Sequence, residues 1–184
     1  MKKIYAVYCI VKLIKQPKWL DDFREKYDEA YDFHITLKQA AYIEDQQIGD
    51  IRKILDGIFA DFGKDKSDIK IVFDNLLLDK EEGYIYLFAK SNKLLDNLQK
   101  EIRNALKRYS DYVNSKSIKY EYDFKPHITI ARNLGEQRFM EARASLKQDY
   151  MCEGKITEIV LSCVKEISVE EAHNLDNLKR YKIR

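Results

Sequence analysis

The chain has 184 residues, of which 45% are hydrophobic and 35% charged, with six glycines and two prolines. This composition is typical of an ordered globular protein and excludes a linker or a disordered tail, and no stretch approaches the apolar length of a membrane span. The formal net charge of +2 is too small for a protein that coats long nucleic acid.

The N-terminal segment begins with two lysines and an apolar run, as a signal peptide does. It lacks a small-residue cleavage site, Lys12 interrupts the apolar run, and the segment is rich in Ile, Val and Tyr. We therefore interpret residues 3–13 as a buried strand.

The three cysteines, Cys9, Cys152 and Cys163, contain no CxxC pair. They favour free thiols in a reducing, cytoplasmic compartment.

The rest of the first half predicts a helix, a strand and a second helix. Residues Pro17–Tyr27 predict a helix with the proline in its first turn. Phe33–Ile43 then has the pattern of a strand. Apolar residues recur at helical spacing over Gln46–Phe62, which predicts an amphipathic helix that ends at Gly63.

The second half begins with two strands joined by a polar turn, which predicts a hairpin. A helix capped by Ser91 follows, running to about Tyr109. The remaining predicted segments are a polar, tyrosine-rich connection over residues 110–123, a strand, a helix over about 136–150, and a closing pair of strands over 156–164 and 178–183. The hairpin strands are predicted over 69–78 and 84–89. Because no linker rich in Pro, Gly or Ser divides the halves, we expect residues 1–184 to form a single domain with two lobes.

One short motif occurs twice, at the start of a predicted strand in each half. The copies are His34-Ile35-Thr36-Leu37 and His127-Ile128-Thr129-Ile130, in a chain with only three histidines and three threonines. By composition alone this repeat has odds on the order of one in a thousand. Residues two apart on a strand face the same way, so each histidine shares a face with its threonine. A single such motif is usually structural, but the repeat favours a function.

If the two lobes pack about a pseudo-twofold axis, the two polar faces oppose each other across a cleft. One neutral imidazole then accepts a proton from an attacking hydroxyl or water, and the other, as imidazolium, donates one to the leaving oxygen. The threonine hydroxyls donate hydrogen bonds to non-bridging phosphate oxygens. No carboxylate has a recognisable ligand spacing to the histidines, so we predict neither a metal site nor another cofactor.

Other polar residues are less specific. His173 lies in a polar segment and is interpreted as a surface residue. The cluster Lys100, Arg103, Lys107 and Arg108 has helical spacing and is interpreted as a solvated helix face, while the cluster Lys179, Arg180, Lys182 and Arg184 is left open. Lys38 and Lys125, close to the motifs, either attract phosphate or are solvated.

The two motif segments, FHITLK and FKPHITIAR, resemble the 2H phosphoesterase superfamily, particularly its 2′-5′ RNA ligase-like and cyclic phosphodiesterase branch. The first segment lacks the proline that often precedes the motif. The resemblance implies an α+β, bilobal fold of two pseudo-twofold-related, mostly antiparallel sheets with outer helices and a central cleft. It also implies His34 and His127 as the acid and base, and Thr36 and Thr129 as phosphate-binding residues.

The resemblance further implies that Arg132 contacts the substrate, since it matches an arginine found five residues after the second histidine in several members. Strict alternation places Arg132 on the face opposite His127, so this role requires a bend or a strand end. Members of the family commonly stack a nucleobase on an aromatic ring. Here the aromatic residues near the motifs are Tyr42, Tyr120, Tyr122 and Phe124, each of which packing alone also explains.

We therefore expect a metal-independent phosphodiesterase that acts on RNA ends, short oligonucleotides or cyclic nucleotides. It would open 2′,3′-cyclic phosphates or cleave 2′-5′ linkages, with ligation as the formal reverse. Two alternatives are a hydrolase of cyclic or linear oligonucleotide second messengers and a non-catalytic RNA-binding module. We expect a monomer, with no membrane association and no protein partner.

Overall fold

The computed structural model of the chain describes residues 2–28, 31–62 and 69–183. Its strands are β1 (Lys2–Lys15), β2 (His34–Glu44), β3 (Lys70–Asp79), β4 (Tyr84–Ala89), β5 (Asp111–Tyr112), β6 (His127–Ala131), β7 (Cys152–Val164) and β8 (Leu178–Lys182). Its helices are α1 (Trp19–Tyr27), α2 (Ile48–Phe62), α3 (Lys93–Ala105), α4 (Ser117–Tyr122), α5 (Glu136–Ser145) and α6 (Val169–His173). In these ranges no helix has the length and apolar character needed to cross a membrane.

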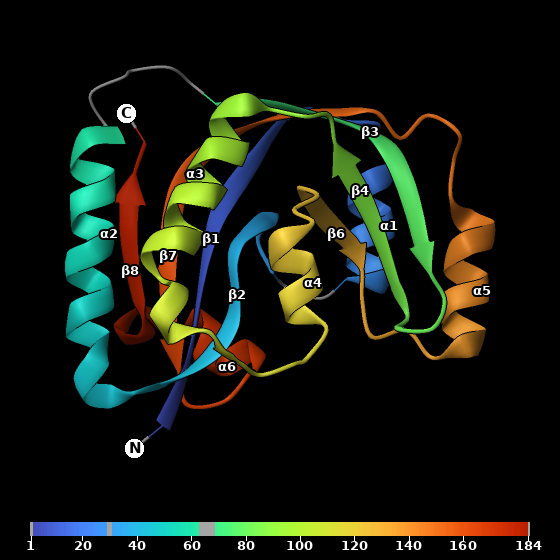
Figure 1. Ribbon diagram of the computed structural model, residues 1–184. Helices are drawn as coiled ribbons and strands as arrows, with labels where there is room; N and C mark the ends of the chain where they lie inside the picture. The colour runs from blue at the N-terminus through green and yellow to red at the C-terminus, as the bar shows by residue number, and fades with distance from the viewer. Residues whose placement is uncertain (1, 29–30, 63–68, 184) are drawn as a thin grey trace.

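All the strands belong to one eight-stranded sheet in the order β5-β2-β1-β7-β3-β4-β6, with β8 paired to β7. Every pairing is antiparallel. The structure thus has the predicted α+β architecture, with the two expected sheets present as two halves of one sheet. In Figure 1, β1 and β7 run side by side behind α3, with α2 at the left and α1 and α5 at the right.

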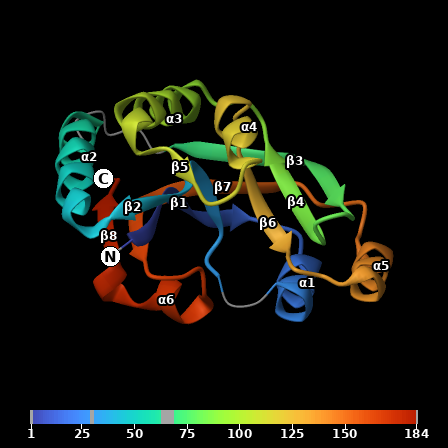
Figure 2. The ribbon, with the colours of Figure 1, turned by 60° about the horizontal axis from the view of Figure 1, so that its bottom comes forward.

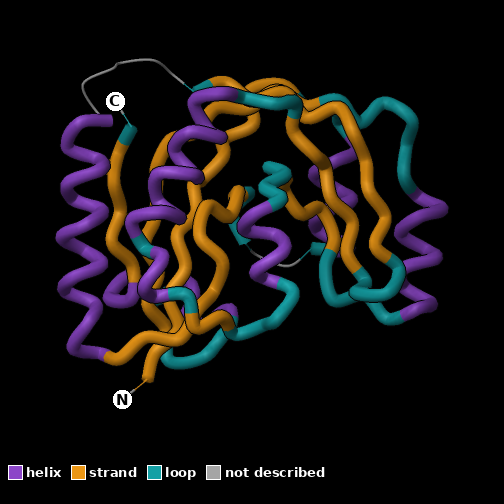
Figure 3. Tube along the Cα trace, viewed as in Figure 1, coloured by secondary structure: helices purple, strands orange, loops and turns teal. Residues whose placement is uncertain are grey.

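The sheet curls so that strands distant in its order approach each other. β2 and β6 stand near opposite ends of that order, yet their Cα atoms come within 8 Å. Figure 3 shows helices at both edges of the sheet and two helices, α3 and α4, lying across its front. Figure 2 shows the sheet between α3 and α4 on one face and α6 on the other. The two strands that carry the repeated motif are therefore neighbours in space.

Side chains alternate along β1 between the core and the face that opens towards α6. Tyr5, Val7 and Cys9 are buried, whereas Ala6 and Tyr8 are partly exposed. This period of two is what a sheet with one face covered by helices requires. The partly exposed face of β1 is thus available to line a cavity.

The ends of the helices differ from the predicted ones. α1 begins at Trp19, so Pro17 precedes the helix and does not lie in its first turn. Asn92, not Ser91, caps α3, because its side-chain oxygen accepts the backbone N–H groups of Leu94 and Leu95 at 3.1 and 3.2 Å. α3 ends at Ala105 and is followed by a 3-10 turn over Lys107–Tyr109, and α5 ends at Ser145, where the backbone becomes extended. The predicted end of α2 at Gly63 lies outside the described residues.

The predicted connection over residues 110–123 instead contains β5 and α4. α4 has only six residues and lacks a regular apolar stripe, so its helical form depends on contacts with the rest of the protein. Glu121 supplies the main contact, since its side chain is buried and pairs with Lys38 of β2 at 2.5 Å. Tertiary structure therefore decides the conformation of this segment.

Candidate active site

The two histidines occupy equivalent positions, each as the first residue of its strand. The Nδ1 atom of His34 lies 2.9 Å from the carbonyl oxygen of Asp32, and Nδ1 of His127 lies 2.8 Å from that of Lys125. A carbonyl oxygen only accepts hydrogen bonds, so Nδ1 of each ring must carry the proton. In the neutral ring Nε2 is then left with its lone pair, ready to accept a proton.

The residue before each histidine also has the same backbone role. The carbonyl of Phe33 accepts the N–H of Val11 at 2.8 Å, and the carbonyl of Pro126 accepts the N–H of Ala89 at 2.8 Å. Only the carbonyl takes part in this bond, so proline and phenylalanine serve equally well. The proline missing from the first motif therefore leaves this strand pairing intact.

A tyrosine lies opposite each threonine on the neighbouring strand. Thr36 pairs with Tyr8 and Thr129 pairs with Tyr86. The Tyr8 ring lies 5.2 Å from that of His34, and the Tyr86 ring lies 4.8 Å from that of His127. Both tyrosines were missing from the sequence-based candidates, because strand register, and not distance along the chain, brings them to the motifs. The aromatic residues named instead include Tyr42, Tyr120 and Tyr122, all of them exposed.

Each motif is followed by an equivalent β-bulge. The pairing shifts between Tyr8↔Thr36 and Val7↔Lys38 in one half, and between Tyr86↔Thr129 and Ile85↔Ala131 in the other. Residues 34–38 and 127–131 accordingly share one burial pattern, in which the fourth and fifth residues are both buried. A bulge shifts every later residue to the other face of the strand. The fifth residue after each histidine, Gln39 or Arg132, thereby returns to the cleft side.

Arg132 follows the last residue of β6, which supplies the bend or strand end that its predicted place requires. Its Nε donates to the buried Asp28 carboxylate at 2.5 Å, and its guanidinium lies 4.4 Å from the centre of the Tyr31 ring. Arg24 binds the other oxygen of Asp28 at 3.0 Å. These contacts use one edge of the Arg132 guanidinium, and the two Nη groups have no hydrogen-bond partner within the described ranges. The Nη groups are therefore free to bind an anion.

A cavity of about 440 Å³ contains His34, Thr36, Gln39 and Arg132 among its lining residues. Its walls come from β1, β2, β7, β8 and the segment around α6. His173 is exposed, as predicted, but it stands at this cavity and its ring lies 5.8 Å from that of Tyr31. His127 and Thr129 do not line it. They lie on β6, the strand that approaches β2.

The electrostatics connect the two motifs. Burial lowers the pKa of His34 below its ordinary value, and the nearby positive charges of Arg132 and His127 lower it further. Burial also lowers the pKa of His127, against the effect of its hydrogen bond to Lys125. Both imidazoles are therefore biased towards the neutral form. The two motifs and Arg132 share one charged environment.

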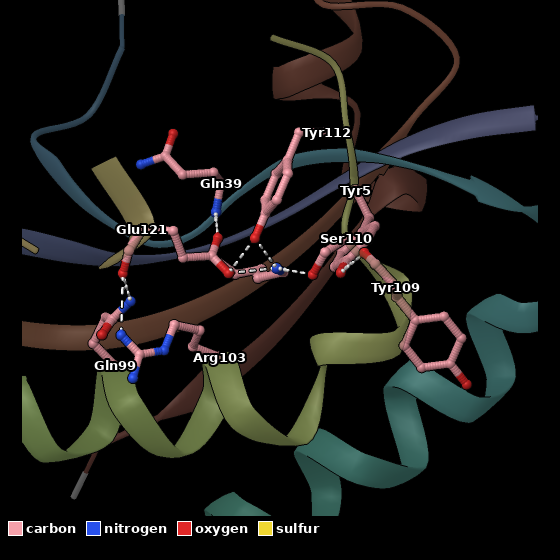
Figure 4. A network of polar contacts seen from close by, with 9 residues as sticks. Tyr5, Gln39, Gln99, Arg103, Tyr109, Ser110, Tyr112 and Glu121 are labelled. Atoms are coloured by element: carbon pink, nitrogen blue, oxygen red, sulfur yellow. Dashed lines mark hydrogen bonds and ion pairs between the residues drawn. The ribbon is translucent and has the colours of Figure 1, made fainter. Parts of the chain in front are cut away.

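Lys38 neither binds phosphate nor meets solvent, contrary to both sequence-based interpretations. The bulge turns its side chain to the helix side of the sheet, where it is fully buried and bonds to Glu121, Ser110 and Tyr112. Figure 4 shows these three partners close together. The second oxygen of Glu121 accepts the backbone N–H of Gln39 at 3.0 Å. Burial lowers the pKa of Lys38, and the bond to Glu121 opposes that shift. The pair thus holds the bulge that follows the first motif.

The second bulge is held differently. The backbone N–H of Arg132 donates to the carbonyl of Tyr27 at 3.3 Å, so a main-chain group of α1 does what Glu121 does in the first half. The position equivalent to Lys38 is Ala131.

As for metal ligands, the described ranges contain no group of three or more His, Cys, Asp or Glu side chains arranged to hold an ion.

Comparisons with known proteins agree with this architecture. Two Geobacillus proteins, each named "Putative phosphoesterase", are similar in sequence. The one from strain WCH70 is 30% identical over 69% of this chain and 68% of its own length, and the one from G. kaustophilus HTA426 is 29% identical over 73% and 75%. The crystal structure of Escherichia coli LigT with 3′-AMP matches 100% of this chain and 97% of its own, with 11% identity and a TM-score of 0.52.

The structure of Kluyveromyces marxianus Usb1 matches 97% of both chains, with 8% identity and a TM-score of 0.50. At these identities the structural matches establish the fold alone. In sequence, the model of the 2′-5′ RNA ligase superfamily matches residues 14–163. The chain therefore belongs to the 2′-5′ RNA ligase superfamily of 2H phosphoesterases.

Proposed function

We propose that the protein is a metal-independent phosphodiesterase that cleaves RNA-type phosphodiesters, either 2′,3′-cyclic phosphate ends or 2′-5′ linkages. The family and the fold support a phosphoesterase function in general. The observation that carries the finer proposal is the pair of equivalent imidazoles. Each has its Nδ1 proton fixed by a carbonyl and its Nε2 free. Two such groups are what a reaction with one proton accepted and one donated requires.

The reaction we infer transfers one proton at each histidine. A water molecule, or the neighbouring 3′-hydroxyl of a 2′-5′ linkage, attacks phosphorus while one neutral Nε2 accepts its proton. The new P–O bond forms as the bond to the leaving oxygen breaks, and the other histidine, as imidazolium, protonates that oxygen. Thr36 and Thr129 donate hydrogen bonds to the non-bridging oxygens, and the free Nη groups of Arg132 face the same negative charge.

We assign the base role in hydrolysis to His34 and the acid role to His127. After burial, the positive charge of Arg132 is the next influence that lowers the pKa of His34, and it has no counterpart at His127. This charge favours the neutral form of His34, which is the form that a base requires. In the reverse direction, ligation, the two roles would exchange.

We also propose that residues 1–184 act as one two-lobed domain, because the strands of both halves belong to a single hydrogen-bonded sheet.

The LigT structure was determined with 3′-AMP, and the cavity beside His34 has a volume typical of ligand sites. A nucleotide or an RNA end is therefore the substrate class that we propose.

The test is a screen of the purified protein against 2′,3′-cyclic nucleotides, 2′-5′ and 3′-5′ oligoadenylates and cyclic dinucleotides, with product ends identified by mass. We expect cleavage of the first or second class, activity that persists in EDTA, and a loss of about 10²–10⁴-fold in His34→Ala and in His127→Ala. Cleavage of cyclic dinucleotides alone would favour a second-messenger hydrolase. RNA affinity without cleavage would favour a binding module, and loss of activity in EDTA would favour a metal mechanism.

A further inference from the structure

A second hollow lies next to His127 and is separate from the cavity beside His34. Phe88 packs its ring 5.1 Å from that of His127, and Lys125 supplies the carbonyl that orients His127. Both residues also line an open groove of about 570 Å³. Its other walls come from β3, α3 and residues 122–126. Among the described residues, the groove and the cavity have no lining residue in common.

Aromatic rings are available along this groove. Phe88 and Phe124 are partly exposed, and Tyr122 is 58% exposed. The Arg103 guanidinium lies 4.8 Å from the centre of the Tyr122 ring. Every nucleobase has a flat face, so rings and guanidinium planes of this kind bind single-stranded RNA with little regard to sequence. The groove thus offers several surfaces for base stacking.

Two cations of the groove have no acidic partner within the described ranges. These are Lys100 and Arg103, which lie one turn apart on α3. The other charges of the groove are largely satisfied, since Asp123 pairs with Lys125 at 2.9 Å and Asp74 pairs with Lys90 at 3.1 Å. Asp96 accepts a hydrogen bond from Ser91 at 3.3 Å.

The structure also divides the basic cluster that the sequence suggested. Lys100 and Arg103 line the groove, whereas Lys107 is exposed outside it. Arg108 lies 4.7 Å from the centre of the Tyr109 ring and 3.9 Å from the Asp50 carboxylate. The predicted solvated helix face is thus divided: Lys107 and Arg108 lie in the 3-10 turn after α3, and Lys100 and Arg103 face a hollow that adjoins His127.

We propose that this groove binds the nucleotides of a single-stranded RNA that continue beyond the scissile phosphate, with phosphates at Lys100 and Arg103 and bases against Phe88, Phe124 and Tyr122. The proposal rests on the proposed function and narrows its substrate class. It assigns as substrate a linear oligonucleotide that extends past the reaction centre on the His127 side. A mononucleotide or a closed cyclic dinucleotide would leave the groove empty.

The test compares kcat/KM for RNA substrates of increasing length that carry the scissile linkage found in the screen, from the shortest cleavable unit to an octanucleotide. We expect kcat/KM to rise with length in the wild type. In Lys100→Gln/Arg103→Gln, the ratio of kcat/KM for the octanucleotide to that for the shortest substrate should fall by about tenfold or more. The matched control, Lys107→Gln/Arg108→Gln, should keep the wild-type ratio. A ratio that does not depend on length, or one that the groove variant retains, would overturn the proposal.

A binding measurement separates failure of this proposal from failure of the proposed function. The affinity of a fluorescent single-stranded octanucleotide without a cleavable end is measured against salt concentration. For each phosphate that the groove variant no longer binds, the slope of log affinity against log salt should decrease in magnitude by about 0.7. If nothing is cleaved but this change occurs, the groove is right and the phosphodiesterase is wrong. If the groove variant keeps the wild-type salt slope and the protein still cleaves RNA, the phosphodiesterase is right and the groove is wrong.

Discussion

The two motif regions share the same strand register and burial pattern, and they differ in the contacts that hold them. In each, a histidine begins a strand, a threonine faces a tyrosine of the neighbouring strand, and a bulge follows. The first bulge is held by a buried Lys38–Glu121 pair, and the second by a main-chain carbonyl of α1. After the first bulge the residue that returns to the cleft is Gln39, and after the second it is Arg132.

The two equivalent histidines therefore lie in unequal surroundings. The acid and the base must both reach the scissile phosphodiester, but one must be protonated and the other neutral. Equivalent backbone positions alone do not produce this difference in protonation. The inequality comes from Arg132, whose charge acts on His34 across the cleft, and from the hollows, one beside each histidine.

The largest expected effect comes from breaking the buried pair. Glu121→Gln leaves the Lys38 ammonium buried without a counter-charge, so the free energy of unfolding should fall by about 3–5 kcal/mol. Urea denaturation measures this change. Glu153→Gln, which breaks a solvent-exposed pair with Lys15, is the control and should cost less than about 1 kcal/mol. Equal losses in the two variants would show that the pair does not hold β2.

The second prediction concerns the threonines. Thr36→Val and Thr129→Val keep the shape of the side chain and remove one hydrogen-bond donor from each half. We expect each to lower kcat by about 10²–10³-fold, the usual effect of losing a donor to a transition-state oxygen. Single-turnover rates, with circular dichroism to confirm folding, measure it. A full rate in either variant would remove that hydroxyl from the mechanism.

The third prediction uses the inequality between the histidines. Removing the charge in Arg132→Gln should raise the pKa of His34, because the guanidinium lowers it. If His34 is the base, the acidic limb of the pH profile of kcat/KM then moves to higher pH. The value of kcat/KM also falls, because a charged hydrogen bond that stabilises the transition state by about 1.5–3 kcal/mol is lost. Arg132→Lys should leave the limb in place. If the acidic limb keeps its wild-type position in Arg132→Gln, His34 is not the base.

The smallest expected effect is at Gln39, the counterpart of Arg132. Gln39→Ala removes a neutral amide from the cavity while the backbone bond to Glu121 remains, so kcat/KM should change by less than about 1 kcal/mol. Steady-state kinetics on the same substrate measure it. A loss as large as that of Arg132→Gln would mean that the two positions have equal roles.

Much of the fold follows from patterns that the sequence displays. The hairpin of β3 and β4 and the pairing of β7 with β8 match the predicted segments, as do the strands of both motifs. The helix-end errors, such as Ser91 in place of Asn92 as a cap, are local. The misses at the candidate site depend on contacts between distant segments. Alternation alone places Lys38 beside Thr36, and only the bulge, held by Glu121 from a helix 83 residues away, turns it inward. Tyr8 and Tyr86 likewise meet the histidines through strand register.

The ladder between β1 and β7 has a consequence for motion. It runs from Ile4↔Val164 at one end to Lys15↔Glu153 at the other, with register shifts after Ile10 and after Leu13. β2 and β8 flank it near the first end, and β3 flanks it near the second. To swing one half of the sheet against the other, the protein would have to bend or open these shared strands. We therefore expect the amide hydrogens of β1 and β7 to exchange last with solvent. Substrate would then enter by movement of side chains and loops around a cleft of fixed width.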